Sequence, residues 1–345
     1  MYRFTNDYSE GAHPRILDAM VRTNLEGNFG YSTDPHSKHA HELIRAAIGR
    51  PDADVHILVG GTQTNATCLC AFLRPHEAAI AATTGHICVH ETGAIEATGH
   101  KCIAMPAAPG GKLTPDAVRA AVAAHPDEHM VKPKLVYVSN TTETGGVYTT
   151  AELEALRAVC DELGLYLYLD GARLSSALAA GGASLTDLGR LCDAFYIGGT
   201  KNGALFGEAV CILNPALKPD FRYIIKQHGG MLAKGRLLGL QVLALLDGED
   251  GSGSSPYFAL AAEADRQALQ IRDAFAAKGL AAQYDAPANQ QFFVLPDAWY
   301  DALAARYAMS PMGKPDAGHT AVRFCTSWAT RPEAVAQLLA DIAAL

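Results

Sequence analysis

The sequence predicts an α/β fold in which a mainly parallel sheet carries helices on both faces. Two observations lead to this fold class. Through the first two thirds of the 345 residues, short apolar runs alternate with longer amphipathic runs, and glycine or polar residues separate one run from the next. Strands that alternate with helices are joined by crossover connections, which leave neighbouring strands parallel and cover both faces of the sheet.

The expected elements follow from apolar periodicity and from turn signals. Apolar runs predict strands at residues 55–61, 77–82, 101–106, 134–140, 165–172 and 194–199. Apolar residues at helical spacing predict helices at residues 62–73, 86–99, 113–125, 150–164 and 185–192. Thr114 is the expected N-cap of the third helix, Pro115 stands at its first position, and Gly164 ends the fourth.

A run rich in glycine, serine and aspartate at residues 247–255 follows an apolar helix that begins at residue 236. We expect a hinge or turn there, and therefore a domain boundary. Beyond it, helix and strand patterns alternate again at residues 257–279, 291–296, 301–308, 321–328 and 331–345. The predicted organisation is an N-terminal arm (1–14), a large domain (15–247) and a smaller C-terminal α/β domain (248–345).

Composition and charge exclude several classes of function. The formal net charge is -8 and the isoelectric point is about 5.9, which opposes binding to nucleic acid. We expect a cytoplasmic protein, because no targeting pattern opens the chain and no apolar run approaches the length of a membrane span. The eight cysteines are scattered through apolar stretches, which favours free thiols. Three neighbouring histidines (His36, His39 and His41) lack the spacing of a metal site, so no metal is expected.

Three stretches that carry chemistry each follow a predicted strand. Gly60, Gly61 and Thr62 stand where a strand turns into a helix, so backbone N–H groups and a hydroxyl can face a phosphate. The alternative is a tight turn with Thr62 as a simple N-cap. Asp170 ends an apolar strand and requires a cationic partner, for which a protonated pyridine nitrogen and Arg173 are the two candidates.

Lys201 follows another strand, in the segment YIGGTKNGALFGEAV. Apolar and very small residues surround it, and desolvation lowers the pKa of a lysine toward the range in which its amine attacks a carbonyl. A phosphate cup, a strand-end aspartate and a lysine after a strand, in that order, are the parts that a pyridoxal 5'-phosphate site requires.

Eight motifs in order resemble those of a known family, over nearly the whole chain: FTNDYSEGAHPRILDAM, FGYSTDPHSKHAHELIRAAIG, GGTQTNA, GHICVHETGA, SNTTETGGVYTTAELEAL, YLDGARL, GGTKNGAL and AVRFCTSWAT. The family is that of the L-threonine aldolases, within the beta-eliminating lyase group. GGTKNG and VRFCTSWAT are most similar to the low-specificity and phenylserine-type branch. The resemblance implies fold type I of the pyridoxal phosphate enzymes, which is aspartate aminotransferase-like and has a mainly parallel seven-stranded sheet.

The resemblance also implies a role for each matching residue. Lys201 would form the Schiff base with the cofactor, Asp170 would pair with the pyridine nitrogen, and His86 would stack on the ring. The rest of the cofactor would be held by Gly60, Gly61, Thr62, Asn140 and Arg173. The substrate would be bound by Asn6, Tyr31, Arg173 and Arg323, of which the two arginines suit a carboxylate.

His129 falls where the family places a histidine near the substrate hydroxyl, so His129 and His86 are the candidates for the base. From the residues alone, His129 could equally be an exposed loop histidine and His86 a helix cap. Three positions depart from the family pattern: Asn6 and Gly60 replace serines, and Ser139 replaces a glutamate. Three cations could reach the phosphate, a neighbouring subunit or solvent: Lys226, Lys234 and Arg236.

The function that the resemblance implies is cleavage of L-threonine and L-allo-threonine to glycine and an aldehyde, with other β-hydroxy-α-amino acids as further candidates. An aminotransferase or a β-eliminating lyase would use the same lysine and aspartate, and a non-catalytic binding protein is a further alternative. The resemblance implies a homodimer or homotetramer with active sites at the dimer interface.

Overall fold

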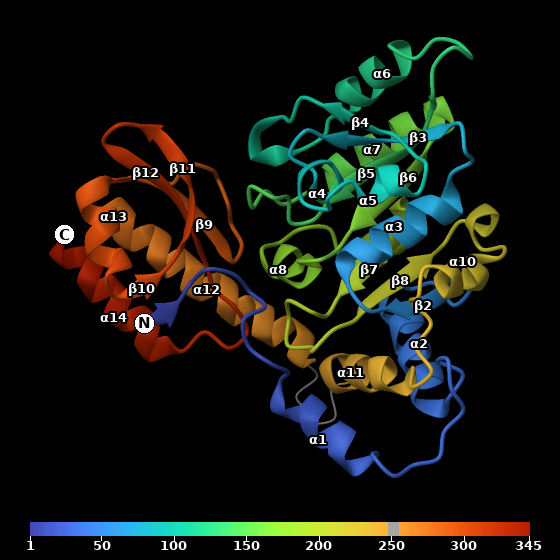
Figure 1. Cartoon of the computed structure of the whole chain (residues 1–345), viewed down its shortest axis with the longest axis horizontal. Helices are drawn as coiled ribbons and strands as arrows, with labels where there is room; N and C mark the ends of the chain where they lie inside the picture. Colours follow the sequence, from blue (N-terminus) through green and yellow to red (C-terminus); the bar gives the residue numbers. More distant parts are fainter. Residues whose placement is uncertain (248–254) are drawn as a thin grey trace.

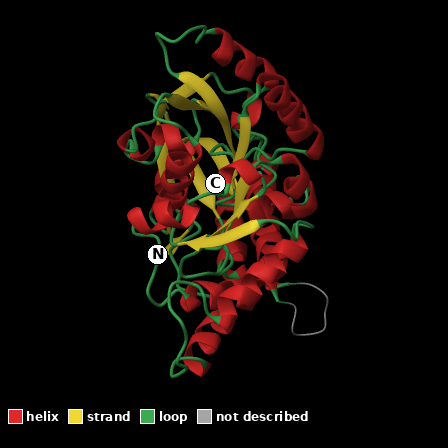
Figure 2. Cartoon of the chain, turned by 90° about the vertical axis from the view of Figure 1, so that its right-hand side faces the viewer, coloured by secondary structure: helices red, strands yellow, loops and turns green. Residues whose placement is uncertain are grey.

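The computed structural model describes residues 1–247 and 255–345, which form a large body around one sheet and a smaller body around another. Figure 1 shows the smaller body, built mainly from the C-terminal segments, beside the large one. Figure 2 shows that the strands lie in the interior, with helices on both sides. None of the helices within these ranges is long and apolar enough to cross a membrane.

The large body contains the seven-stranded, mainly parallel sheet that the sequence analysis predicted. In order across the sheet, its strands are β2 (Asp54–Leu58), β8 (Glu208–Ile212), β7 (Ala194–Gly198), β6 (Tyr166–Asp170), β5 (Lys132–Ser139), β3 (Glu77–Ala82) and β4 (Cys102–Met105). β8 is antiparallel to both of its neighbours, and the other strands run in one direction. β8 was not among the predicted strands. It is antiparallel because a link of nine residues from β7 leaves no room for a crossover helix.

Helices cover both faces of this sheet and complete two apolar cores. One face is covered by α3 (Gly61–Phe72), α5 (Ala94–Ala97) and α10 (Phe221–Gln227). The other is covered by α1 (Pro14–Arg22), α2 (Pro35–Ala47), α6 (Pro115–Ala123), α7 (Thr150–Leu163), α8 (Leu174–Ala179), α9 (Leu185–Leu191) and α11 (Arg236–Leu246). The predicted caps are confirmed: the Thr114 side chain accepts a hydrogen bond from the backbone of Ala117, and Gly164 ends α7 with φ of 65°.

The helix predicted over residues 86–99 is wrong in one respect. The structure has two short helices there, α4 (His86–Val89) and α5, separated by a turn. Thr92 and Gly93 have φ values of 54° and 70°, which a right-handed helix does not allow. The break leaves His86 on a separate short helix at the end of β3.

The smaller body has its own sheet and its own core. Its sheet has the order β11 (Ser310–Asp316), β12 (His319–Cys325) and β9 (Gln290–Pro296), all antiparallel, and it packs with α12 (Pro256–Ala277), α13 (Asp297–Ala304) and α14 (Pro332–Ala344). Phe275, Phe293 and Phe324 are buried between them. β11 was not predicted, because most of its residues are polar, small or proline and its side chains are largely exposed.

The first residues of the chain belong to the smaller body. β1 (Tyr2–Arg3) pairs in parallel with β10 (Tyr307–Ala308), and Phe4 is buried in the C-terminal core. The chain then crosses to α1 of the large body. The division at residues 14/15 and 247/248 stays a prediction, and residues 248–254 of the run that carries its second boundary lie outside the described residues.

Candidate active site

Five connections meet at one edge of the large sheet. β3, β5, β6 and β7 are parallel, and β2 runs in the same direction because it and β7 are both antiparallel to β8. Their carboxyl ends therefore lie at the same edge, where ligands of open α/β sheets bind. The residues that follow these ends are 60–62 (β2), His86 (β3), Asn140 (β5), Asp170 (the last residue of β6) and Lys201 (β7).

Lys201 lies three residues beyond β7, in a partly enclosed position. Burial lowers the pKa of its amine below the ordinary value, and the positive charge of Arg173 lowers it further. The carboxylates of Asp7, Asp170 and Glu208 act in the opposite direction. The amine thus lies among several charged groups rather than on an open turn.

Asp170 is a buried carboxylate held by four hydrogen bonds. Tyr137 and Asn65 donate to its Oδ2 at 2.6 and 2.9 Å, the backbone N–H of Ala172 donates to its Oδ1 at 3.0 Å, and the Tyr196 hydroxyl also donates to Oδ1. Burial raises the pKa of Asp170, but these donors outweigh it and bring the pKa below its ordinary value. Asp170 is therefore ionised at neutral pH.

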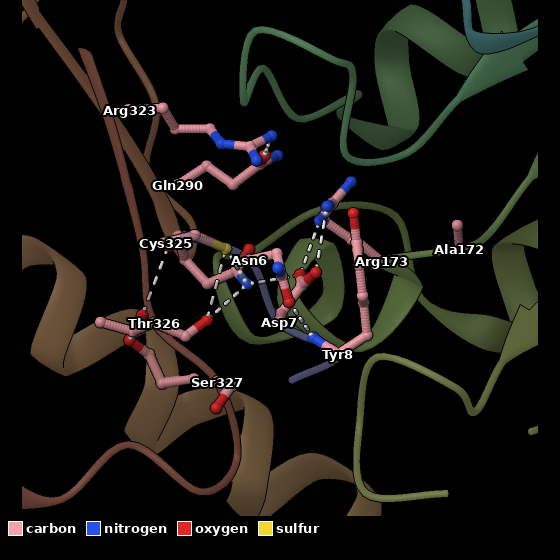
Figure 3. A network of polar contacts seen from close by, with 12 residues as sticks. Asn6, Asp7, Tyr8, Ala172, Arg173, Gln290, Arg323, Cys325, Thr326 and Ser327 are labelled. Carbon is pink, nitrogen blue, oxygen red and sulfur yellow. Dashed lines mark hydrogen bonds and ion pairs between the residues drawn. The ribbon is translucent and has the colours of Figure 1, made fainter. Parts of the chain in front are cut away.

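Arg173 does not pair with Asp170. Its Nε and Nη2 atoms bind the two carboxylate oxygens of Asp7 at 2.7 and 3.1 Å (Figure 3). Asn289 also donates to Asp7, at 2.9 Å. The interpretation of Arg173 as the partner of Asp170 is thus wrong. Among the described residues, no arginine or lysine forms a salt bridge with Asp170, which leaves its charge available to a ligand cation.

Asp7→Asn is expected to change the pH dependence of stability. Burial raises the pKa of Asp7, but Arg173, Lys201 and the hydrogen bonds lower it from 3.8 to about 2. The ionised carboxylate therefore stabilises the fold above about pH 4, by about 2 kcal/mol, and this contribution is lost as the pH falls through about 2. In urea unfolding, the variant should be less stable by at least that amount at pH 7, and the difference should shrink toward pH 2. A difference in unfolding free energy between variant and wild type that stays constant with pH would contradict the assignment of Asp7 as an ionised partner of Arg173.

His86 is the first residue of α4, and its ring does not cap the helix. Its Nδ1 lies 2.7 Å from Glu91 Oε1, and Asn65 Nδ2 donates to the same oxygen at 2.7 Å. Because Asn65 also binds Asp170, a continuous chain of hydrogen bonds joins the imidazole to the strand-end carboxylate. The His90 ring lies beside the His86 ring, with 5.4 Å between centroids.

The turn at residues 60–62 and Asn140 each present hydrogen-bond donors. Gly60 is the N-cap of α3 and supplies no side-chain cap, so the first N–H groups of the helix stay available to an anion. Thr62 lies inside the helix, and the alternative that it is the N-cap is wrong. Asn140 accepts a hydrogen bond from Tyr148 at 3.1 Å, while its buried Nδ2 has no partner among the described residues.

Arg323 approaches from the smaller body. It lies on β12 and donates to Gln290 at 3.1 Å and to the backbone oxygen of Thr5 at 2.9 Å. Asn6 follows Thr5 and accepts a hydrogen bond from the backbone of Tyr8 at 3.0 Å. Figure 3 shows the Arg323 guanidinium directed toward the side of the network on which Arg173 lies. The N-terminal segment and the smaller body thus complete the edge of the site.

Two predicted site residues are not brought to this edge within one chain. His129 precedes β5, whose eight residues span about 25 Å, so it lies at the opposite edge of the sheet. Its side chain is 85% exposed and faces Asp127. Tyr31 lies beside α10, where Lys226 stands 4.7 Å from its ring centroid. Of the other two cations, Arg236 binds Thr23 and Lys234 is exposed.

The structure adds polar residues that the sequence analysis missed: Asp7, Asn65, His90, Glu91 and Glu208. Asn65 lies one helical turn after Gly61, and His90 and Glu91 lie one turn after His86. Side chains four residues apart share a helix face, which was the available signal for Asn65 and His90. Asp7 carried no comparable signal, because its partner Arg173 is 166 residues away in the sequence.

Comparisons with known proteins agree with this geometry. Residues 6–324 match the family model described as beta-eliminating lyase. A low specificity L-threonine aldolase of Pseudomonas aeruginosa is 32% identical, over 99% of this chain and 96% of its own length. A solved structure of Leishmania major threonine aldolase superposes with a TM-score of 0.96 at 45% identity, covering 99% of this chain and 98% of that one. A mutant aspartate aminotransferase of Thermus thermophilus shares the fold, with a TM-score of 0.74 at 20% identity over 100% and 91% of the two chains. The chain therefore has fold type I and belongs to the beta-eliminating lyase family.

Proposed function

We propose that this protein is a pyridoxal phosphate-dependent aldolase that cleaves L-threonine and L-allo-threonine to glycine and acetaldehyde. The observation that carries the proposal is the pair formed by Asp170 and Lys201 at one edge of the sheet. Asp170 is ionised and no arginine or lysine among the described residues binds it, and Lys201 is an amine whose pKa burial lowers. A protonated pyridine ring with an aldehyde beside it complements both groups. The related threonine aldolases support the choice of substrate.

The residues present fit pyridoxal phosphate. Lys201 would hold its aldehyde carbon, Asp170 its ring nitrogen, and the N-terminal end of α3 its phosphate. The unpartnered Nδ2 of Asn140 is a buried donor that a ring substituent would satisfy. His86 would lie against the ring. When bound, pyridoxal phosphate supplies an electron sink for the bond that breaks between Cα and Cβ of the substrate.

The chain's own side chains would bind the substrate and move its protons. Arg323 would bind the substrate carboxylate. Arg173 would also bind that carboxylate if Asp7 were displaced from it. The β-hydroxyl must lose a proton as the carbon–carbon bond breaks, and His86 and His90 are two imidazoles at this edge. Burial and the charges of His86 and Arg323 lower the pKa of His90, so it is neutral at neutral pH and able to accept that proton. These two histidines replace His129 as candidates for the base.

A direct assay separates this function from its alternatives. The purified protein is incubated with the cofactor and L-threonine, L-allo-threonine or phenylserine, and the aldehyde and glycine are measured. Formation of both in equal amounts is expected. Ammonia with a keto acid would instead identify a β-eliminating lyase, and a keto acid that appears only with an amino-group acceptor would identify an aminotransferase. If none of the substrates is consumed and no bound cofactor absorbs visible light, the protein is non-catalytic.

We also infer that a second copy of the chain covers the surface around α1 and the segment after it. Leu25 and Phe29 are 95% and 81% exposed there, and Val21 and Tyr31 lie close by in the sequence. An apolar surface of this kind is typical of a contact between proteins. A homodimer or homotetramer would cover it and would place Tyr31 and Lys226 at the partner's active site.

A further inference from the structure

A buried carboxylate without a role in the proposed reaction so far contacts the imidazole of His86. Glu91 lies in the turn between α4 and α5, and its side chain is 0% exposed. Its Oε1 lies 2.7 Å from His86 Nδ1. Its Oε2 is buried and has no hydrogen-bond partner among the described residues, so the carboxylate depends on the donors that reach Oε1.

Asn65 fixes which atoms donate and which accept at this contact. Its Oδ1 accepts a hydrogen bond from the Tyr168 hydroxyl at 3.0 Å. The two N–H groups of its Nδ2 donate to Glu91 Oε1 at 2.7 Å and to Asp170 Oδ2 at 2.9 Å. A flipped amide would turn its oxygen toward two carboxylates, which is repulsive. Glu91 Oε1 is therefore an acceptor, and because an ionised carboxylate only accepts, the hydrogen between it and His86 belongs to Nδ1.

The contact with Glu91 selects the tautomer of His86. A neutral imidazole carries one hydrogen, so a hydrogen on Nδ1 leaves the lone pair on Nε2. Free histidine favours the opposite tautomer, with the hydrogen on Nε2. No described residue forms a hydrogen bond with His86 Nε2, and the side chain is 31% exposed, so a ligand can reach this nitrogen. The ring of His90, by contrast, forms no hydrogen bond within the described ranges, and no such contact selects its tautomer there.

We propose that Glu91 is a positioning residue that holds the hydrogen of His86 on Nδ1, so that Nε2 takes the proton of the substrate β-hydroxyl. As the bond between Cα and Cβ breaks, the hydroxyl proton passes to Nε2, the C–O bond becomes the carbonyl of the aldehyde, and the electron pair of the broken bond stays with the glycine fragment. The imidazolium that forms keeps its Nδ1–H on Glu91, whose negative charge stabilises it. In the overall reaction one proton leaves the hydroxyl and one joins Cα of glycine, so none is gained or lost. The inference rests on the proposed function, in which the substrate carries a β-hydroxyl group.

The test reads the tautomer of His86 in the full-length protein, with and without pyridoxal phosphate. Histidine is labelled with nitrogen-15, and long-range proton–nitrogen correlation spectra at about pH 8, where an ordinary histidine is neutral, distinguish the protonated ring nitrogen from the bare one. The His86 signals are identified by their absence in His86→Gln. In the wild type we expect the hydrogen on Nδ1 and none on Nε2. In Glu91→Ala no side-chain acceptor remains, so the ring should change toward the tautomer of free histidine.

Glu91→Gln is the second variant, for use if Glu91→Ala does not fold. Glutamine keeps the shape of the side chain but offers a neutral amide oxygen, which is a weaker acceptor than a carboxylate. A mixture of the two His86 tautomers is therefore expected, in place of the single tautomer of the wild type.

Glu143→Gln is the matched control. Glu143 is a second carboxylate at His86, but it accepts a hydrogen bond from the backbone N–H of that residue, at 2.8 Å, rather than from the ring. Glutamine keeps an oxygen for this N–H, so the tautomer should stay that of the wild type. Three results would overturn the inference: a wild-type ring with its hydrogen on Nε2, an unchanged tautomer in the folded Glu91 variant, or an equal change in Glu143→Gln.

The kinetics give a second readout. Because Glu91 acts through His86 and not on the substrate, Glu91→Ala should lower kcat for L-threonine by about 10- to 100-fold and change KM by no more than about twofold. This loss is a part of the roughly 10² to 10⁴ that a positioned proton acceptor contributes. A higher KM with an unchanged kcat would contradict the role in proton transfer.

The inference and the proposed function fail in distinguishable ways. If the wild type forms acetaldehyde from L-threonine while the tautomer of His86 does not depend on Glu91, only the role of Glu91 is refuted. If the tautomer depends on Glu91 as expected but none of the tested substrates yields an aldehyde, the pairing of Glu91 with His86 stands and the choice of reaction is wrong.

Discussion

Lys201→Ala is expected to abolish covalent attachment of pyridoxal phosphate and with it the visible absorption of the bound cofactor. Aldehyde production from L-threonine should fall by a factor on the order of 10⁴ or more, because alanine offers no amine to join the cofactor or to release it. Borohydride treatment of the wild-type protein with cofactor, followed by peptide mapping, should place the label on Lys201.

The matched control for this variant is Lys101→Ala. Lys101 is exposed and directly precedes β4, at the edge of the sheet opposite the site. Its replacement should leave both absorption and rate within about twofold, as is usual for exposed positions away from special features. A label on another lysine, or an unaltered spectrum in Lys201→Ala, would remove the central assignment.

Asp170→Asn is expected to produce the second largest loss of activity. The substitution keeps the shape of the side chain but removes the negative charge that would hold the pyridine nitrogen protonated. Fixed charges of this kind in buried sites typically contribute a factor of about 10² to 10³ in rate. The new amide also faces Asn65 and Tyr137 as a donor, so a loss of about 1–3 kcal/mol in the free energy of unfolding is expected as well.

Asp193→Asn separates the two effects. Asp193 directly precedes β7 at the opposite edge of the same sheet, where it binds Arg157 at 2.7 Å and accepts a hydrogen bond from the backbone of Leu167 at 2.7 Å. Its replacement should lower the free energy of unfolding in urea without changing kcat of the folded protein. Equal kcat values for Asp170→Asn and wild type would show that no cofactor nitrogen depends on that carboxylate.

The parts of the fold that follow from local pattern were predictable. Apolar periodicity predicted the parallel strands. The Thr114 side chain caps the start of α6, and Gly164 ends α7 in a left-handed conformation that glycine adopts readily. The turn at Thr92 and Gly93 was missed, because the apolar residues before and after it were assigned to one helix. β8 was also missed, although its residues form an apolar run, and its antiparallel direction depends on the length of a link and on a pairing between strands.

The candidate site likewise contains residues that local sequence pattern could predict and residues that it could not. Gly60, Asp170 and Lys201 were found because each lies at or shortly after the end of a strand, so the sheet alone brings them together. The pairing of Arg173 with Asp7 was missed, because it joins the ends of distant segments and depends on where the smaller body lies. The position assigned to His129 rested on the order of motifs, which gives no information about the edge of the sheet at which a residue lies.

The bridge formed by Asp7 has a consequence for how a ligand would be sensed. Asp7 binds Arg173 of the large body and Asn289 of the C-terminal segment at the same time. If an incoming carboxylate took the Nε and Nη2 atoms of Arg173 from Asp7, it would free one of the ties between the two bodies. Substrate affinity would then be thermodynamically linked to domain orientation, and an amine without a carboxylate would bind weakly and leave the Asp7 bridge in place.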